Sequence, residues 1–362
     1  MSAQKTNLHR RDALRLGVAA AAAGATGLWP TVSMAAAPPA ASITPDLVAA
    51  AKKEGKVNWY TSVDLKVAEQ VAKAFEGKFP GISVKVERTG AERNFQRIGQ
   101  EYASNIFRCD AVNTSDAAHM IVWKRQGILE AIVPEDVAKH YPAEHRDADG
   151  YYASWRVMLS VIAYNTKLVD PAGAPKSFAD LLDPKWSGKM VKAHPGYSGT
   201  IMTATHQMAR DLGWEYFERL AKQKILQVQS AADPPKKLAL GERAIMVDGG
   251  DYVAQVQIDK GAPLAIVYPS EGTPLITGPS AVMKKAPNPN AAKLFHLWGF
   301  SPEGQEIAVK VGALRSAHAL VKDKLRPQRK PLSEIKLMKE NAAEVEKMAD
   351  DIKKRYAAIF KV

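Results

Sequence analysis

Cysteine is nearly absent from this chain: among 362 residues there is one, Cys109, which excludes an internal disulfide bond. It stands in the apolar run FRCDAVN, which is typical of a buried side chain and not of a reactive thiol. After the N-terminal segment, no stretch approaches the roughly 18 consecutive apolar residues that a membrane-spanning helix needs. We therefore expect no membrane insertion.

Known catalytic motifs are also missing. The chain contains no G-x-S-x-G, H-E-x-x-H, C-x-x-C or phosphate-binding P-loop pattern. Its eight histidines are dispersed, and only Asp116 and His119 have a spacing that could place two metal ligands on one face of a helix. That pair is a weak signal, so we expect His119 on the surface. The sequence predicts a protein that is not an enzyme and binds no cofactor.

A basic arm of the kind that binds nucleic acid is absent as well. The formal net charge is +12, but the lysines are scattered among carboxylates, as in AKKEGK and MKENAAEVEKMADDIKKR. Most of these charges are expected on a solvated surface. Nucleic acid is therefore not an expected partner, and the excess positive charge mildly favours acidic ligands.

The N-terminal segment has the features of an export signal. Residues 1–37 combine Arg10, Arg11 and Arg15 with a short alanine-rich run and end in small residues suited to cleavage. The adjacent arginines indicate twin-arginine export. Ala13 stands where a large apolar residue is common, so a general secretory signal is the alternative. Either signal predicts a protein of the periplasm.

The next part of the chain alternates short strands with amphipathic helices, which predicts parallel strands in an α/β sheet. Strands are expected within residues 55–64, 82–90 and 107–116, and helices within 65–79, 91–105 and 117–129. Ligands bind beyond the carboxyl ends of such strands. The residues placed there are Tyr60, Thr61, Ser62, Thr89, Gly90, Ser115 and Asp116. For each one alone, a turn or cap role is the alternative.

Two extended runs, near residues 155–169 and 274–283, bracket a second α/β segment. That segment has a long amphipathic helix through residues 214–223 and a strand that ends near Asp248 and Asp251. We expect a first lobe of residues 38–157 and 275–362, a second lobe of residues 158–274, and a ligand between them. The C-terminal helix is expected to pack on the first lobe, with a permease contact as the alternative.

One helix start is a candidate anion site. In HPGYSGTIMTATHQMARDL, Pro195 and Gly196 break the chain, and Ser198 and Thr200 stand at the start of an apolar pattern with helical spacing. The first N–H groups of a helix lack intrahelical partners and lie at the positive end of its dipole. Ser198, Gly199 and Thr200 are therefore candidates to bind an anion. The alternative is that Ser198 only caps its own helix.

A family resemblance follows from four stretches in order: EGKVNWYTSVD, DPKWSGKMVKAHPGYSGT, ALGERAIMVDGGDYVAQ and APNPNAAKLFHLWGFSPEGQE. They resemble the extracellular solute-binding proteins of ABC importers, in particular the branch of ferric-ion-binding periplasmic proteins. The resemblance runs from about residue 43 to the C-terminal IKKRYAAIF. It implies a two-lobed, hinged periplasmic-binding-protein fold of type II, which closes on a solute and docks, as a monomer, on a membrane permease.

The resemblance also implies where iron ligands would stand. Those relatives use a histidine, a glutamate and two adjacent tyrosines, an oxygen-rich set suited to a ferric ion. The corresponding places here hold Asp64, Ser115, Gly250 and Asp251, with Tyr252 one step on, so the tyrosine pair is absent. The alternative to an anion is a metal or organic cation held by Asp64, Asp116, Asp251 and Tyr252.

The segment that matches Ser198, Gly199 and Thr200 holds an anion in those relatives. Since this segment is kept while the metal ligands are not, we expect the ligand to be a small organic solute with a carboxylate, phosphonate or phosphate ester. Arg88, Arg93 and Arg156 are candidates for its charge partner, because a guanidinium offers two parallel donors. Ser230 is a further candidate. Trp59, Tyr60, Trp155 and Tyr252 are candidates to pack on the solute, with core packing as the alternative.

Overall fold

The computed structural model describes residues 37–322, 326 and 329–362. The expected export signal, residues 1–37, therefore lies almost wholly outside the described residues. The rest of the chain forms one compact unit with two separate β-sheets. Within the described residues, no helix is long and apolar enough to cross a membrane.

The first sheet has the strand order β12-β11-β3-β1-β2, and β4 and β5 also pair with β11. Its strands are β1 (Lys56–Thr61), β2 (Ser83–Arg88), β3 (Ala111–Asn113), β4 (Leu129–Glu130), β5 (Ala153–Leu159), β11 (Thr273–Met283) and β12 (Leu337–Met338). As the alternating pattern predicts, β1 is parallel to both β2 and β3. The carboxyl ends of β1, β2 and β3 therefore meet at one edge.

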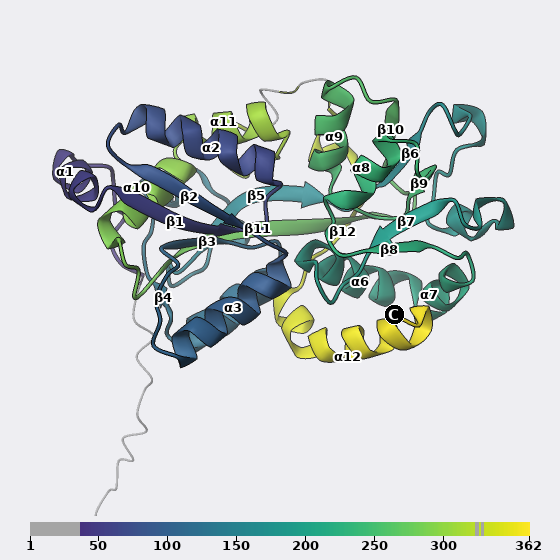
Figure 1. Ribbon diagram of the computed structural model, residues 1–362, viewed down its shortest axis with the longest axis horizontal. Helices are drawn as coiled ribbons and strands as arrows, with labels where there is room; N and C mark the ends of the chain where they lie inside the picture. Colours follow the sequence, from purple (N-terminus) through teal and green to yellow (C-terminus); the bar gives the residue numbers. More distant parts are fainter. Residues whose placement is uncertain (1–36, 323–325, 327–328) are drawn as a thin grey trace, which may run out of the picture. The chain divides into compact units, whose positions relative to one another are not determined.

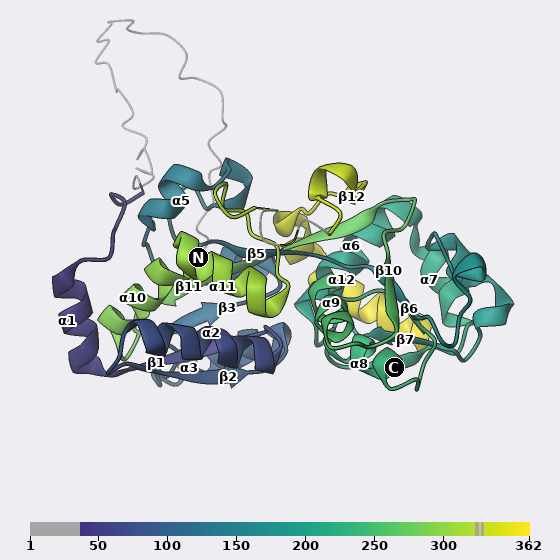
Figure 2. The ribbon, with the colours of Figure 1, turned by 90° about the horizontal axis from the view of Figure 1, so that it is seen from above.

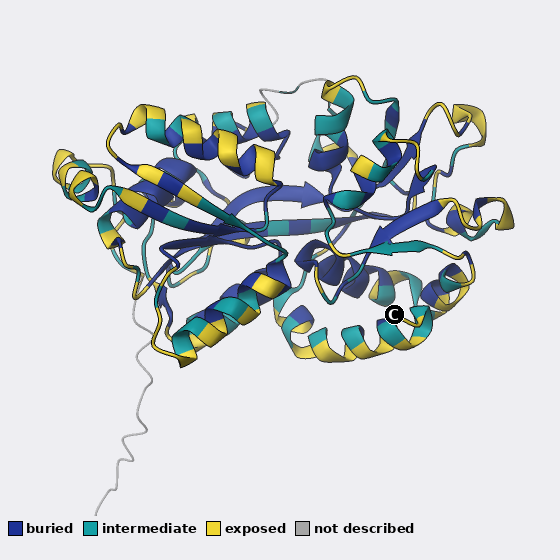
Figure 3. Cartoon of the chain, viewed as in Figure 1, coloured by how far each residue is buried: buried dark blue, intermediate teal, exposed yellow. Residues whose placement is uncertain are grey.

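The second sheet has the order β10-β6-β9-β7-β8. Its strands are β6 (Ile162–Asn165), β7 (Met190–Ala193), β8 (Leu226–Val228), β9 (Ile245–Met246) and β10 (Leu264–Val267). The chain passes from the first sheet to the second between β5 and β6, and returns between β10 and β11. These are the two β crossings expected from the extended runs, and β5 and β11 are buried along most of their length (Figure 3).

Helices cover both sheets (Figure 1). They are α1 (Pro45–Glu54), α2 (Leu65–Lys78), α3 (Ala91–Ala103), α4 (Ala117–Arg125), α5 (Glu135–His140), α6 (Gly199–Leu212), α7 (Trp214–Ala221), α8 (Asp233–Ala239), α9 (Asp251–Asp259), α10 (Pro289–Phe300), α11 (Pro302–Gly312) and α12 (Ala342–Phe360). The helices expected after the first three strands are confirmed as α2, α3 and α4. The helix expected through residues 214–223 is observed as α7, which is only eight residues long and is separated from α6 by Gly213, with a φ of 80°.

The core of the first sheet is aromatic. The ring centroid of Phe295 lies 5.2 Å from that of Trp59 and 5.0 Å from that of Phe75. The ring centroids of Trp155 and Trp59 are 6.0 Å apart. Core packing is thus the observed role of Trp59 and Trp155, and not contact with a solute. Cys109 is buried at the end of the same sheet, as its apolar surroundings predict.

The C-terminal helix α12 contacts elements of both sheets. It packs on α4, as expected for the first lobe, and also on α6 and α7 beside the second sheet (Figure 2). The reason is Tyr356, which is fully buried and whose ring lies 4.9 Å from His194 and 6.4 Å from Phe217. The expected packing on the first lobe is therefore only half of what the helix does.

Candidate functional site

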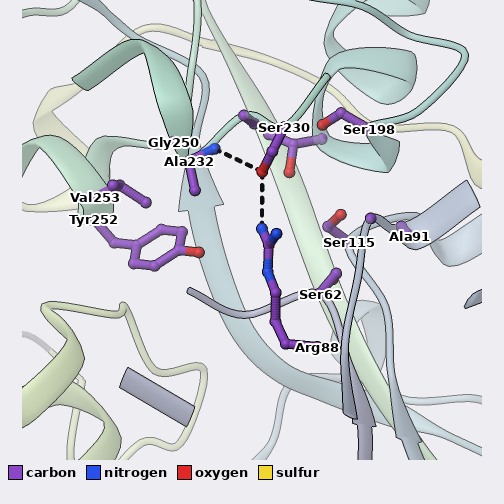
Figure 4. A pocket seen from close by; sticks show the side chains of 13 residues that line it. Ser62, Arg88, Ala91, Ser115, Ser198, Ser230, Ala232, Gly250, Tyr252 and Val253 are labelled. Carbon is purple, nitrogen blue, oxygen red and sulfur yellow. Dashed lines mark hydrogen bonds between the residues drawn. The ribbon is translucent and has the colours of Figure 1, made fainter. Parts of the chain in front are cut away.

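A pocket lies where loops from both sheets meet (Figure 4). It is lined by thirteen residues. Six of them carry a hydroxyl group and one, Arg88, carries a charge; none is a carboxylate. The lining residues are Ser62, Arg88, Gly90, Ala91, Ser115, Ser198, Thr200, Ser230, Ala231, Ala232, Gly250, Tyr252 and Val253.

Three helices begin at this pocket. Helix α3 starts after Gly90, α6 after Ser198 and α9 after Gly250, and all three of these N-cap residues line the cavity. No side chain caps α3 or α9, whereas the Ser198 hydroxyl accepts a long hydrogen bond of 3.4 Å from the Ile201 N–H. The positive ends of the helix dipoles therefore add to the charge of Arg88 and favour an anion.

Arg88 crosses the pocket from β2. Its Nε donates to the Val63 carbonyl, 3.2 Å away, and its Nη2 donates to the Ser230 hydroxyl, 2.8 Å away in the loop after β8 (Figure 4). It forms no ion pair with a carboxylate in the described part of the chain. A guanidinium with neutral partners alone retains its full charge for a ligand.

Arg156 lies behind the pocket wall and is only 1% exposed. Its guanidinium donates to Asn113 Oδ1 at 2.5 Å and to the Ser62 hydroxyl at 3.1 Å, while its Nε has no partner. Burial lowers the pKa of Arg156 to about 10; Tyr252 opposes this shift and Arg88 adds to it. Among the described residues no carboxylate pairs with Arg156, so a buried positive charge stands beside the pocket uncompensated.

Two glycines allow the walls of the pocket to approach each other. A Cβ at Gly90 would lie 2.5 Å from the Tyr197 carbonyl oxygen, although Gly90 itself has an ordinary φ of −62°. A Cβ at Gly199 would lie 2.7 Å from the Asp116 Cβ and 3.0 Å from the Ala91 Cβ. The starts of α3, α4 and α6 therefore come together only because both positions lack a side chain.

The structure brings together seven of the sixteen residues that the sequence proposes for ligand binding. They are Ser62, Gly90, Ser115, Ser198, Thr200, Ser230 and Tyr252. Arg88, one of the three candidate arginines, also lines the pocket. Gly199 does not line it but packs directly behind, against Asp116 and Ala91.

The carboxylates proposed for a cation are engaged elsewhere. Asp64 caps α2 and forms an ion pair with Lys236 at 2.9 Å, and Asp116 caps α4. Asp251 is fully buried between Arg315 and Arg329 and also accepts from the Leu159 N–H.

Asp248 is another predicted site residue that lies outside the pocket. It forms a fully buried ion pair with Lys192 of β7. Of the four residues in the proposed cation set, only Tyr252 lines the pocket, where its hydroxyl accepts from the Asp64 N–H at 3.1 Å.

Four further predicted residues serve the protein itself. The Tyr60 hydroxyl donates to Glu101 at 2.8 Å, because residue 60 of β1 faces the core under α3. The Thr61 hydroxyl accepts from the Val63 N–H, and the Thr89 N–H donates to the Thr61 carbonyl. Arg93 is exposed and donates to Gln229 at 2.6 Å.

His119 is buried, so its expected surface position is wrong. Its Nε2 lies 2.9 Å from Glu92 Oε1, its Nδ1 lies 3.0 Å from the Thr114 hydroxyl, and its ring stacks on Phe95 at 4.4 Å. One ligand atom each of His119, Glu92 and Asp116 lie within 4.8 Å of one another. Lys353 of α12 also pairs with Glu92, which completes an internal ion-pair cluster.

Five lining residues were not proposed from the sequence to bind the ligand, although Gly250 was named at a place where relatives have an iron ligand: Ala91, Ala231, Ala232, Gly250 and Val253. None has a polar side chain, so no motif marks them. Ala91 is the first residue of α3 and Gly250 is the N-cap of α9. Both could have been found by taking the first residues of each helix that follows a predicted strand as candidates.

A family model for bacterial extracellular solute-binding proteins matches residues 114–333, more than half of the chain. The chain belongs to this family. A probable ABC transporter periplasmic-binding protein of Sinorhizobium fredii, y4fP, is 25% identical over 250 residues, which are 66% of this chain and 68% of that protein. An uncharacterized protein of Haemophilus influenzae is 26% identical over 276 residues, or 72% and 78% of the two chains. This solute-binding protein is the periplasmic component of an ABC transporter.

Solved structures agree on the fold. The periplasmic binding protein AfuA from Actinobacillus pleuropneumoniae, with fructose-6-phosphate bound, matches with a TM-score of 0.77 and 24% identity over 85% of this chain and 99% of AfuA. Iron-bound HitA from Pseudomonas aeruginosa matches with a TM-score of 0.70 and 24% identity over 84% and 99%. The predicted two-lobed fold of type II periplasmic binding proteins is therefore confirmed.

Proposed function

We propose that this protein binds the anionic end of a small organic solute, a carboxylate, phosphonate or phosphate ester, and delivers it to the permease of its transporter. One observation supports this above all: Arg88 lines a pocket without a carboxylate, and the unpaired charge of Arg156 is buried behind Ser62. An anion would compensate both charges. A hydrogen bond to a charged group contributes roughly 1.5–3 kcal/mol, so a few of them would support micromolar affinity.

The two structural neighbours suggest the two solute classes to compare. AfuA holds a sugar phosphate, and HitA holds iron. A ferric ion requires anionic oxygen ligands, whereas the polar lining here consists of neutral hydroxyls, helix N-termini and a guanidinium. This donor set favours a phosphate or carboxylate over a metal or organic cation.

The binding mechanism that we propose is closure of two lobes. Two hydrogen bonds join the two sides: Arg88 to Ser230 across the pocket, and Arg93 to Gln229 outside it. The sequence predicts the lobes at residues 38–157 with 275–362 and at residues 158–274. We instead assign α12 to the second lobe, because Tyr356 anchors it to Gln227 of β8 and Phe217 of α7. The solute would meet one lobe and shift an equilibrium between open and closed forms. The protein would act as a monomer without catalysis, after export through the signal in residues 1–37.

Native mass spectrometry of the protein purified from periplasm tests the ligand class, with the intact mass compared before and after denaturation. Loss of an organic mass that contains a phosphate or carboxylate is the expected result. Calorimetry then compares D-fructose 6-phosphate, inorganic phosphate, D-fructose and ferric citrate. Binding of the neutral sugar equal to that of its phosphate, or release of a metal, would overturn the anion assignment.

Gly90→Ala is expected to weaken anion binding at least tenfold, because its Cβ would keep the walls of the pocket apart. The backbone of Gly90 suits alanine, so the only conflict is with the Tyr197 carbonyl when the pocket closes. Gly99→Ala, a change in the same helix, is the control, because its Cβ would meet nothing within 4 Å. Calorimetry and thermal unfolding of both variants measure the effect, and equal affinities would refute it.

A further inference from the structure

Helix α12 is anchored on the second sheet by its C-terminal half. The Tyr356 hydroxyl donates to Gln227 of β8 at 2.9 Å, and its ring contacts Lys192 of β7, His194 just after β7, and Phe217 of α7. The Arg355 guanidinium lies 4.7 Å from the Trp214 ring centre. These contacts fix α12 to the sheet that provides Ser198, Thr200 and Ser230 to the pocket.

The same helix also contacts the first-sheet side of the pocket, by packing on α4 and by an ion pair to α3. Lys353 Nζ lies 2.7 Å from Glu92 Oε2 in the first turn of α3. The Glu92 side chain is only 4% exposed, whereas that of Lys353 is 32% exposed. Burial alone would raise the pKa of Glu92, but His119 and then Lys353 outweigh it and lower the pKa to about 2. Glu92 is therefore a buried anion that depends on both partners.

Glu92 stands next to the pocket without lining it. Its neighbour Ala91 lines the cavity, and its partner His119 belongs to α4, whose N-cap Asp116 touches Gly199 of α6. Separation of α12 from α3 would leave Glu92 with His119 and would replace Lys353 by water. Removing one partner of a buried ion pair is costly, so this pair forms most favourably when the pocket walls are together.

We infer that Lys353 and Glu92 form a latch that stabilises the closed pocket, so both act as positioning residues for solute binding although neither contacts the solute. The inference rests on the proposed closure. In this role α12, which is fixed to the second sheet, uses Lys353 to hold Glu92 at the start of α3, on the opposite wall of the pocket. The position of α12 at the end of the chain does not by itself suggest such a role.

The first test measures closure without any ligand. Spin labels are placed at exposed Glu69 of α2 and Glu218 of α7 by Glu→Cys changes, in a Cys109→Ala background, and their distance distribution is recorded. Lys353→Met is expected to shift the population toward longer distances, and Lys353→Arg to restore the wild-type distribution. An unchanged distribution in Lys353→Met overturns the latch, whether or not any anion binds.

The second test uses affinity, with D-fructose 6-phosphate and inorganic phosphate as probes. Lys353→Met is expected to weaken binding five- to twentyfold, mainly through faster dissociation. The matched control is Arg125→Met, which removes another ion pair between α4 and α12, Arg125 with Glu346 at 2.6 Å, where Arg125 is 61% exposed. Equal effects of the two variants would indicate general stabilisation of α12 and overturn the latch. If wild type binds neither probe, the proposed ligand class fails while the distance measurement still decides the latch.

Discussion

Arg88→Met is expected to lower the affinity for an anionic solute roughly 10- to 150-fold, the effect of losing a charge-assisted hydrogen bond worth about 1.5–3 kcal/mol. Arg88 is the one charged side chain among the thirteen that line the pocket. The change also removes its bond to Ser230, which joins the two walls. Calorimetry with D-fructose 6-phosphate measures the loss.

Arg93→Met is the matched control for that experiment. Arg93 is five residues further along, is exposed, and bonds Gln229 without lining the pocket. If the site depended only on the overall positive charge, both variants would lose affinity equally. A large loss in Arg88→Met with little change in Arg93→Met is expected, and the reverse order would place the anion elsewhere.

The second large effect concerns stability at low pH. His296 of α10 is buried, its Nδ1 has no partner, and burial lowers the pKa of its imidazole to about 3 from an ordinary 6.5. Between these values the unfolded chain binds a proton that the folded chain does not. Stability is therefore lost as the pH falls from 6.5 toward 3, by about 3 kcal/mol at pH 4.5 for this histidine alone.

His296→Leu is expected to remove that part of the acid sensitivity. Urea unfolding of wild type and variant at pH 7 and pH 4.5 measures the free energy of unfolding. The carboxylates contribute equally to its pH dependence in both proteins, so the difference between the proteins reports on His296 alone. The variant should lose about 3 kcal/mol less than wild type on acidification. The same loss in both proteins would mean that the imidazole is protonated in the folded state.

Local patterns predicted much of the structure. The order of strands and helices from β1 to α4, the burial of Cys109 and the helix start at Ser198 depend on neighbours within a few residues, which the sequence displays. The expected edge of the first sheet also supplies Ser62, Gly90 and Ser115 to the pocket. Side-chain direction within that edge was less predictable, since Tyr60 lies on the opposite face of β1 and points to Glu101.

The sequence by itself determined the α/β architecture, the two crossings and the hydroxyl-rich helix starts, because these follow from hydrophobic spacing and from turn and cap residues. Only the tertiary structure decided which charges remain for a ligand. Asp251 is neutralised by Arg315 and Arg329, which are 64 and 78 residues away, whereas Arg156 has no carboxylate partner among the described residues. The difference depends on which distant side chains packing brings together, and no local pattern records it.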